Sequence, residues 1–183
     1  MFVPLMGPVQ LPIGTVVDAT RGTLILEMSD GAGGTYTGEF FAGIFTILEQ
    51  TRGVVRRLAG STAPKPKKKM KKKKQATVLF TTLRLEGGDF GVCTGSRALT
   101  AKEKPKPKAI RRLWGNTKGK FRTKGRHSAA TVRGTRWLTS DRCDGTLTYV
   151  AQGGPVSVLD FRLRRTIELR EGQTYIARSR GRR

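Results

Sequence analysis

The chain has 183 residues, enough for one domain or two small ones, and its 36 Lys and Arg outnumber 13 Asp and Glu for a net charge of +23. This excess indicates a polyanionic partner. A hydrophobic content of 37% with 23 glycines nevertheless excludes a fully disordered basic tail, because such a chain can bury a core and turn often.

The N-terminal segment, 1–13, is apolar but is interrupted by Pro4, Pro8 and Pro12. It has neither a basic n-region nor a small-residue cleavage site, so it is not predicted to be a signal peptide. No apolar run approaches the roughly 18 residues of a membrane-spanning helix, and we expect no integral membrane segment. The chain is then either cytoplasmic, or lacks its true N-terminus, or belongs to a longer polypeptide.

Short segments rich in β-branched and aromatic residues, separated by glycines, predict strands joined by tight turns. Asp30-Gly31, Asp144-Gly145 and Gly153-Gly154 are predicted hairpin turns. Only 54–58 indicates a helical turn. The predicted fold class is all-β, an antiparallel sandwich or short β-roll. The predicted strands are 15–17, 23–28, 35–40, 44–48, 78–85, 90–93, 120–123, 128–133, 135–139, 146–151, 155–161, 165–170 and 173–177.

Two segments rich in Lys and Pro interrupt this pattern and predict disordered loop inserts, because like charges on a Pro-stiffened backbone stay extended and solvated. The resulting organisation is an N-terminal β part (1–60), a Lys/Pro-rich insert (61–76), a β segment (77–100), a basic linker (101–118), a C-terminal β part (119–178) and a basic tail (179–183).

The densest charge is a run of eight lysines within 65–74, which predicts a polyanion-binding segment. Lysine rather than arginine suits non-specific charge attraction, and no aromatic residues interleave the run to stack on bases. Anionic cell-envelope polymers or another protein domain are the expected partners, and nucleic acid is the alternative. The lysines are Lys65, Lys67, Lys68, Lys69, Lys71, Lys72, Lys73 and Lys74.

The C-terminal part contains Val132-Arg133-Gly134-Thr135 followed by Trp137, and it closes with an Arg170–Gln173 turn that includes Gly172. In this order and spacing the motifs resemble the FecR-type domain, and the segment 11–23 looks like its opening strands. The likeness is greatest to the actinobacterial extracytoplasmic form with Lys-rich inserts. The resemblance implies an all-β fold and an extracytoplasmic location.

In the better-known members this domain is the periplasmic part of a transmembrane signal transducer. Neither the anti-sigma segment nor the membrane helix of those members occurs in this chain, so the resemblance implies fold and compartment rather than mechanism. Beside the resemblance, Gly134 permits a bulge or a close backbone approach where a strand changes sheets. We therefore expect Val132, Arg133, Gly134, Thr135 and Trp137 to form a structural corner.

Cys93 and Cys143 are the only cysteines, at the end of a predicted strand and in a predicted turn. They form either a disulfide, in an oxidising compartment, or two free thiols in a cytoplasmic chain. With one histidine they are too few for a four-ligand zinc site, so no metal is expected.

Catalytic motifs are not recognisable. His127 has no nucleophile and carboxylate placed around it, the glycines of 115–121 miss the phosphate-loop spacing, and the acidic residues lie at turns. We expect no catalytic residue, no cofactor and no enzymatic activity. The leading hypothesis is an extracytoplasmic structural, binding or sensory module whose basic loops contact anionic envelope polymers, and the alternative is a cytoplasmic β-domain that binds phosphate backbones.

Overall fold

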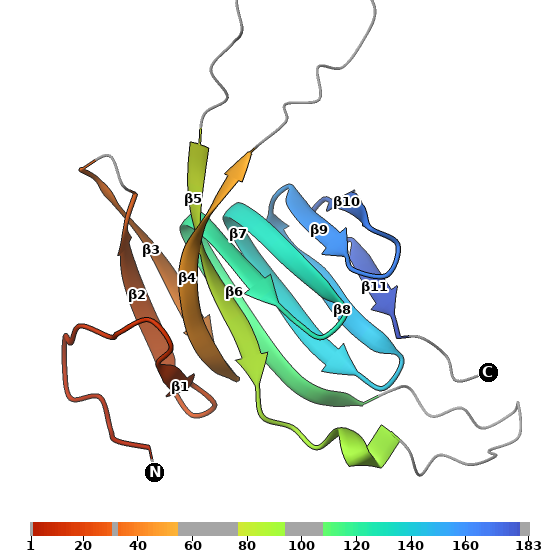
Figure 1. Cartoon of the computed structure of the whole chain (residues 1–183), viewed down its shortest axis with the longest axis horizontal. Coiled ribbons are helices and arrows are strands. Elements are labelled where there is room, and N and C mark those ends of the chain that lie inside the picture. The colour runs from red at the N-terminus through yellow and green to blue at the C-terminus, as the bar shows by residue number, and fades with distance from the viewer. Residues whose placement is uncertain (1, 31–32, 55–76, 94–107, 180–183) are drawn as a thin grey trace, which may run out of the picture.

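The computed structural model describes residues 2–30, 33–54, 77–93 and 108–179. Figure 1 shows an all-β architecture, as predicted, with one short 3₁₀ helix. The elements are β1 (Val16–Asp18), β2 (Thr23–Ser29), β3 (Thr35–Phe41), β4 (Ile44–Val54), β5 (Thr77–Glu86), η1 (Phe90–Cys93), β6 (Ala109–Lys124), β7 (Ser128–Arg142), β8 (Gly145–Gly153), β9 (Val156–Asp160), β10 (Arg165–Leu169) and β11 (Thr174–Arg178).

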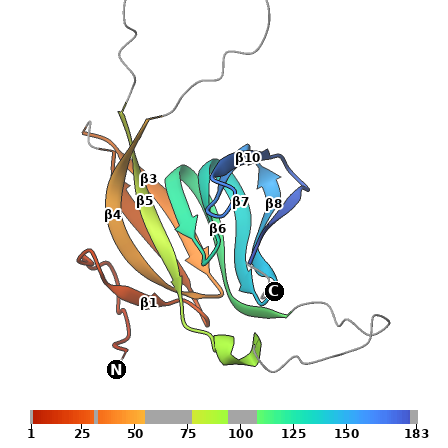
Figure 2. The ribbon, with the colours of Figure 1, turned by 45° about the vertical axis from the view of Figure 1, so that its right-hand side comes forward.

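Two long strands, β6 and β7, pair along most of their length and belong to both layers of the fold (Figure 2). The C-terminal half of β6 pairs with β5, and the N-terminal half of β7 pairs with β9. The first layer therefore has the order β1-β4-β5-β6-β7-β9-β10. The N-terminal half of β6 pairs with β3, and the C-terminal half of β7 pairs with β8, which gives a second layer β2-β3-β6-β7-β8-β11.

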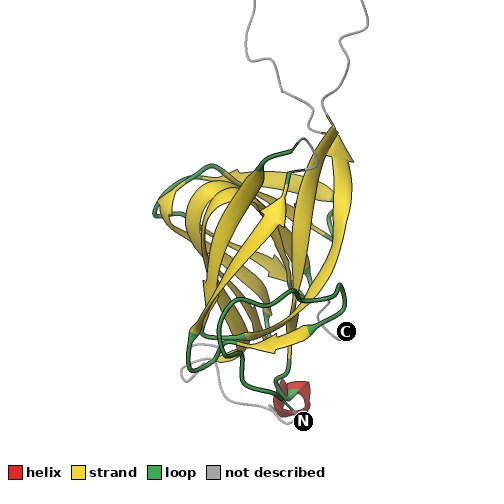
Figure 3. Ribbon diagram, turned by 90° about the vertical axis from the view of Figure 1, so that its left-hand side faces the viewer, coloured by secondary structure: helices red, strands yellow, loops and turns green. Residues whose placement is uncertain are grey.

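The two layers enclose an apolar core, seen edge-on in Figure 3. Side chains alternate between core and solvent along the strands, as a sheet with one buried face requires. Phe40 of β3 meets Phe45 of β4 at 5.8 Å and Trp137 of β7 at 6.2 Å between ring centroids. Trp137, with no exposed surface, lies at the centre and donates its indole N–H to Thr123 at 3.0 Å.

Polar side chains tie the layers together at both ends of the core. The Tyr36 hydroxyl on β3 lies 3.0 Å from the Thr81 hydroxyl on β5. At the other end Tyr175 of β11 donates to the Asp160 carboxylate of β9 at 2.8 Å. Burial raises the pKa of Asp160, but the hydrogen bonds from Leu163, Tyr175 and Arg162 outweigh it and leave the pKa lowered.

The predicted corner is present. Gly134 has a φ of +68°, and the β6–β7 register shifts there so that two residues of β6 lie opposite Gly134. Val132 and Trp137 on either side are fully buried, Thr135 is buried and Arg133 is exposed. Because β7 changes from pairing with β9 to pairing with β8 around this point, the bulge marks the passage between layers. Gly172, with a φ of +77°, lies in the turn between β10 and β11.

Four expectations are corrected. Residues 109–118, expected as linker, form the first part of β6, where buried Leu113 and Thr117 alternate with outward-facing Trp114 and Asn116. Residues 90–93, expected as a strand, form η1. Strands β5 and β6 are parallel, so the sheet is mixed. Gly153-Gly154 is a corner rather than a hairpin turn, because β8 and β9, which it joins, each pair with β7 in different layers and not with each other.

Three further sequence predictions concern a second hairpin turn, Gly31 and the helical turn at 54–58. The turn at Asp144-Gly145 does join paired strands, β7 and β8. Gly31 and the segment 55–58 lie outside the described residues, and Val54 belongs to β4.

Candidate functional site

The outer face of the first layer carries a row of cations on β6. Lys120, Arg122 and Lys124 alternate with buried Phe121 and Thr123, so their side chains leave the same face of the sheet. Neighbouring members of the row are about 7 Å apart along the strand. Arg133 is paired with Lys120 across β6–β7 and is exposed on the same face. We call Lys120, Arg122, Lys124 and Arg133 the cation row.

Arg122 is held at the centre of this row. Its Nε donates to the Thr131 hydroxyl at 3.0 Å, and its guanidinium lies 5.3 Å from the centroid of the Phe80 ring. Burial lowers the pKa of Arg122 from its usual value, although an arginine stays charged at neutral pH. Among the described residues, no carboxylate lies within ion-pair distance of any member of the row. The row can therefore attract several negative groups spaced along one polymer.

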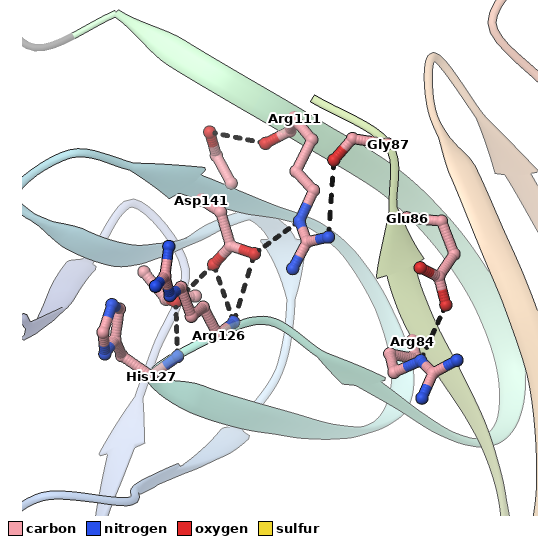
Figure 4. A network of polar contacts seen from close by, with 9 residues as sticks. Arg84, Glu86, Gly87, Arg111, Arg126, His127 and Asp141 are labelled. Carbon is pink, nitrogen blue, oxygen red and sulfur yellow. Dashed lines mark hydrogen bonds and ion pairs between the residues drawn. The ribbon is translucent and has the colours of Figure 1, made fainter. Parts of the chain in front are cut away.

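A second cluster surrounds the buried carboxylate of Asp141 (Figure 4). Arg111 donates its Nε–H to Asp141 at 2.8 Å and an NH1 hydrogen to the Gly87 carbonyl at 3.4 Å. The backbone N–H of Arg126 reaches the two carboxylate oxygens at 2.9 and 3.1 Å, and the Thr146 hydroxyl also donates to this group. The carboxylate oxygens of Asp141 are thus already hydrogen-bonded to groups of the protein itself. This indicates a structural role for Asp141.

The same cluster fixes η1. Phe90 lies under two guanidinium groups, with its ring centroid 5.1 Å from Arg111 and 4.7 Å from Arg126. Cys93, at the end of η1, forms a disulfide with Cys143 in the β7–β8 turn. The sequence allowed either a disulfide or two free thiols, and the structure has the disulfide. The bond closes a loop between two cysteines that are 50 residues apart in sequence.

His127 lies directly before β7, at the entry to the strand. Its backbone N–H donates to the Thr146 hydroxyl at 2.9 Å, while its ring makes none of the contacts drawn in Figure 4. Burial is the main cause that lowers the pKa of His127, with the Arg126 cation acting in the same direction and Asp141 and Asp160 acting against them. No triad is formed by these groups, because Asp141 points to backbone and to Arg111 instead.

This lowered pKa predicts a pH dependence of stability. On acidification the unfolded chain protonates His127 near pH 6.5, before the folded chain does, so the free energy of unfolding falls as the pH is lowered from 7 to 5. We expect His127→Gln to lose less stability than the parent over this interval in urea unfolding. Equal losses in the two proteins would show that His127 is not responsible.

The predicted polyanion-binding lysines, Lys65–Lys74, lie outside the described residues, so their role stays a prediction. Sequence reasoning did not identify the cation row as a site. The signal that could have found the cation row is the alternation of cations with Phe121 and Thr123, which places them on one face of a strand.

In the described parts of the chain no three His, Cys, Asp or Glu side chains gather as a metal site would require. No helix there has the length and apolar character to cross a bilayer. Compared with known protein families, curated proteins and solved structures, the chain gives no significant match. The likeness to the FecR-type domain therefore stays a prediction from the sequence motifs.

Proposed function

We propose that the protein is a non-enzymatic binding module that works outside the cytoplasmic membrane and holds linear anionic polymers of the cell envelope. The observation that supports this most directly is the cation row. A polymer with phosphate or carboxylate groups along its backbone meets a cation at successive outward positions in the C-terminal half of β6, and counterions released from the polymer favour binding.

The compartment is inferred from the disulfide. Disulfides persist in oxidising compartments and are rare in the cytosol, and Cys93–Cys143 stabilises the edge of the second layer next to η1. Anionic polymers present in such a compartment are wall and surface polymers rather than nucleic acids. The FecR-like motifs support the same location.

The test measures binding to immobilised poly(glycerol phosphate) over a salt series, with the triple variant Lys120→Ala, Lys124→Ala, Arg133→Ala. Because each lost contact releases one counterion fewer, we expect weaker binding and a salt dependence whose log–log slope is flatter by about two to three. Arg122 is left in place because its contacts with Thr131 and Phe80 are part of the sheet.

A matched control removes the same charge elsewhere: Arg21→Ala, Arg170→Ala, Arg178→Ala, at exposed positions on other elements. The control should retain most of the affinity. If both triple variants weaken binding equally, net charge alone attracts the polymer and the cation row is not a site. Tighter binding to single-stranded DNA than to the polymer, with the same dependence on the row, would favour the nucleic-acid alternative.

A further inference from the structure

The outer face of the second layer carries a stripe of large side chains that crosses four strands. Phe41 of β3 lies opposite Trp114 of β6, Trp114 opposite Leu138 of β7, and Leu138 opposite Tyr149 of β8. The Phe41 and Trp114 rings are stacked at 6.1 Å with 4° between their planes, and Tyr149 meets Trp114 edge to face at 6.4 Å. We call Phe41, Trp114, Leu138 and Tyr149 the aromatic stripe.

All four residues are half-buried, so part of each remains open to solvent. They face away from the core, since Phe40, Leu113, Trp137 and Val150 beside them in sequence are its fully buried members. The stripe is thus additional to the apolar core. Aromatic rings on the outer face of a sheet supply flat apolar contact area at low entropic cost, which favours ligands made of rings.

One side of the stripe is bordered by polar residues in the next row across the sheet. Glu39, Asn116 and Arg136 follow one another in register on β3, β6 and β7. The Asn116 amide donates to the Glu39 carboxylate at 3.0 Å. Exposed Gln152 on β8 continues the row beyond Arg136. The row therefore offers both donors and acceptors, as recognition of hydroxyl groups requires.

Arg136 is the one cation in this row, and the rings hold its guanidinium in place. It lies 5.7 Å from the Trp114 centroid and 5.9 Å from the Phe41 centroid, over the junction of the two rings. None of the described carboxylates forms an ion pair with it. A planar guanidinium held by aromatic rings, with its N–H edges open, is suited to bind a carboxylate with two hydrogen bonds.

We propose that this face is a second binding site, for a linear polysaccharide that contains acidic sugars. The chain would lie along the aromatic stripe, across the strands, with sugar rings packed on Trp114 and Tyr149. A ring carboxylate would bind Arg136, and the ring hydroxyls would meet the polar row. The inference deepens the proposed function, on whose extracytoplasmic setting it rests, by naming the class of polymer.

Single-stranded nucleic acid is the main competitor, because bases also stack on sheet aromatics. Two observations favour the acidic polysaccharide. Glu39 borders the stripe, where its oxygens can accept hydrogen bonds from the hydroxyl groups that each sugar ring of a polysaccharide carries at its edge. The cations of the first layer, which would guide a phosphate backbone, lie on the opposite face of the sandwich.

The test uses tryptophan fluorescence of the full chain titrated with polygalacturonate, a linear polymer of acidic sugars. Trp137 is fully buried and Trp114 is half-buried, so a change in emission and protection from acrylamide reports on Trp114. We expect both signals with polygalacturonate, and weaker binding, by about fivefold or more, in Tyr149→Ala and Arg136→Gln. Arg178→Gln, the same change on β11 of this layer, should bind as the parent does.

Dextran, polyphosphate and oligo-dT distinguish the outcomes. Binding of dextran as tight as that of polygalacturonate would overturn the role of Arg136, and a larger Trp114 response to oligo-dT would overturn the choice of polysaccharide. Loss of polygalacturonate binding on removing the cation row, with no effect of Tyr149→Ala or Arg136→Gln, would overturn the second site while supporting the first. Conversely, if polyphosphate binds equally well to the parent and to the variant without the cation row, the first site is overturned and the second site is unaffected. Circular dichroism and unfolding midpoints equal to the parent's are required of each variant. Phe41→Leu, which keeps the Trp114 reporter, gives a second test if one of the variants unfolds.

Discussion

Replacing Asp141 by Ala is expected to lower the free energy of unfolding by about 3–5 kcal/mol, because the variant leaves the Arg111 cation without its buried partner. The Asp141 side chain is completely buried, and Arg111 retains 19% of its side-chain exposure. The backbone N–H of Arg126 and the Thr146 hydroxyl lose their acceptor in the same step. Urea unfolding followed by circular dichroism gives the difference directly.

Asp144→Ala is the matched control. Asp144 also pairs with an arginine, Arg142, at 2.6 Å, but a quarter of its side chain is exposed. Because this pair is only partly buried, we expect it to contribute less than the Asp141 network, closer to the roughly 0–1 kcal/mol of solvent-exposed pairs. If Asp141→Ala and Asp144→Ala lower the free energy of unfolding by the same amount, the burial of Asp141 is not what makes its contacts strong. The double variant Asp141→Ala with Arg111→Ala, compared with the two single variants, measures the coupling between the Asp141 and Arg111 side chains.

Removing the disulfide, as Cys93→Ser with Cys143→Ser, is expected to cost about 4 kcal/mol, because a closed loop of this length restricts the unfolded chain. The two cysteines are 50 residues apart in sequence. The parent protein in reducing agent should unfold at nearly the same urea concentration as the double variant. An unchanged midpoint on reduction would show that η1 is held by its other contacts, with Arg111 and Arg126 over Phe90.

Much of the strand pattern could be predicted, because glycines mark the turns and apolar residues alternate in the C-terminal part. The strands from β8 to β11 begin and end within a few residues of the predicted bounds, whereas β7 joins two predicted strands, 128–133 and 135–139, through the bulge at Gly134. The first part of β6 was missed because only Leu113 of its inward positions is large and apolar, while Gly115 and Thr117 are small or polar. Its outward positions are mostly polar or charged. That composition is also typical of a linker, so local pattern alone does not separate the two.

The binding faces depend on strand order, which local pattern does not encode. Phe41, Trp114 and Tyr149 come from three distant segments, and the β3–β6, β6–β7 and β7–β8 registers together bring their rings into one row. The cation row is the exception, because most of it lies on a single strand and follows from alternation. The sequence, read one segment at a time, does not show which remote segments pair, and the binding faces depend on that pairing.

The place of β6 between both layers also has a consequence for synthesis. Residues 2–54 supply the β2–β3 hairpin and β4, yet β3 finds its second neighbour only when β6, Ala109–Lys124, has left the ribosome. Until then the N-terminal pieces can cover each other only in part, through contacts such as Phe40 against Phe45, because Phe121 and Trp137 at the centre of the core are still missing. Nascent chains arrested before residue 109 should therefore be cleaved readily by protease, whereas chains that extend past Gly153 should gain protection together in β3, β5 and β7.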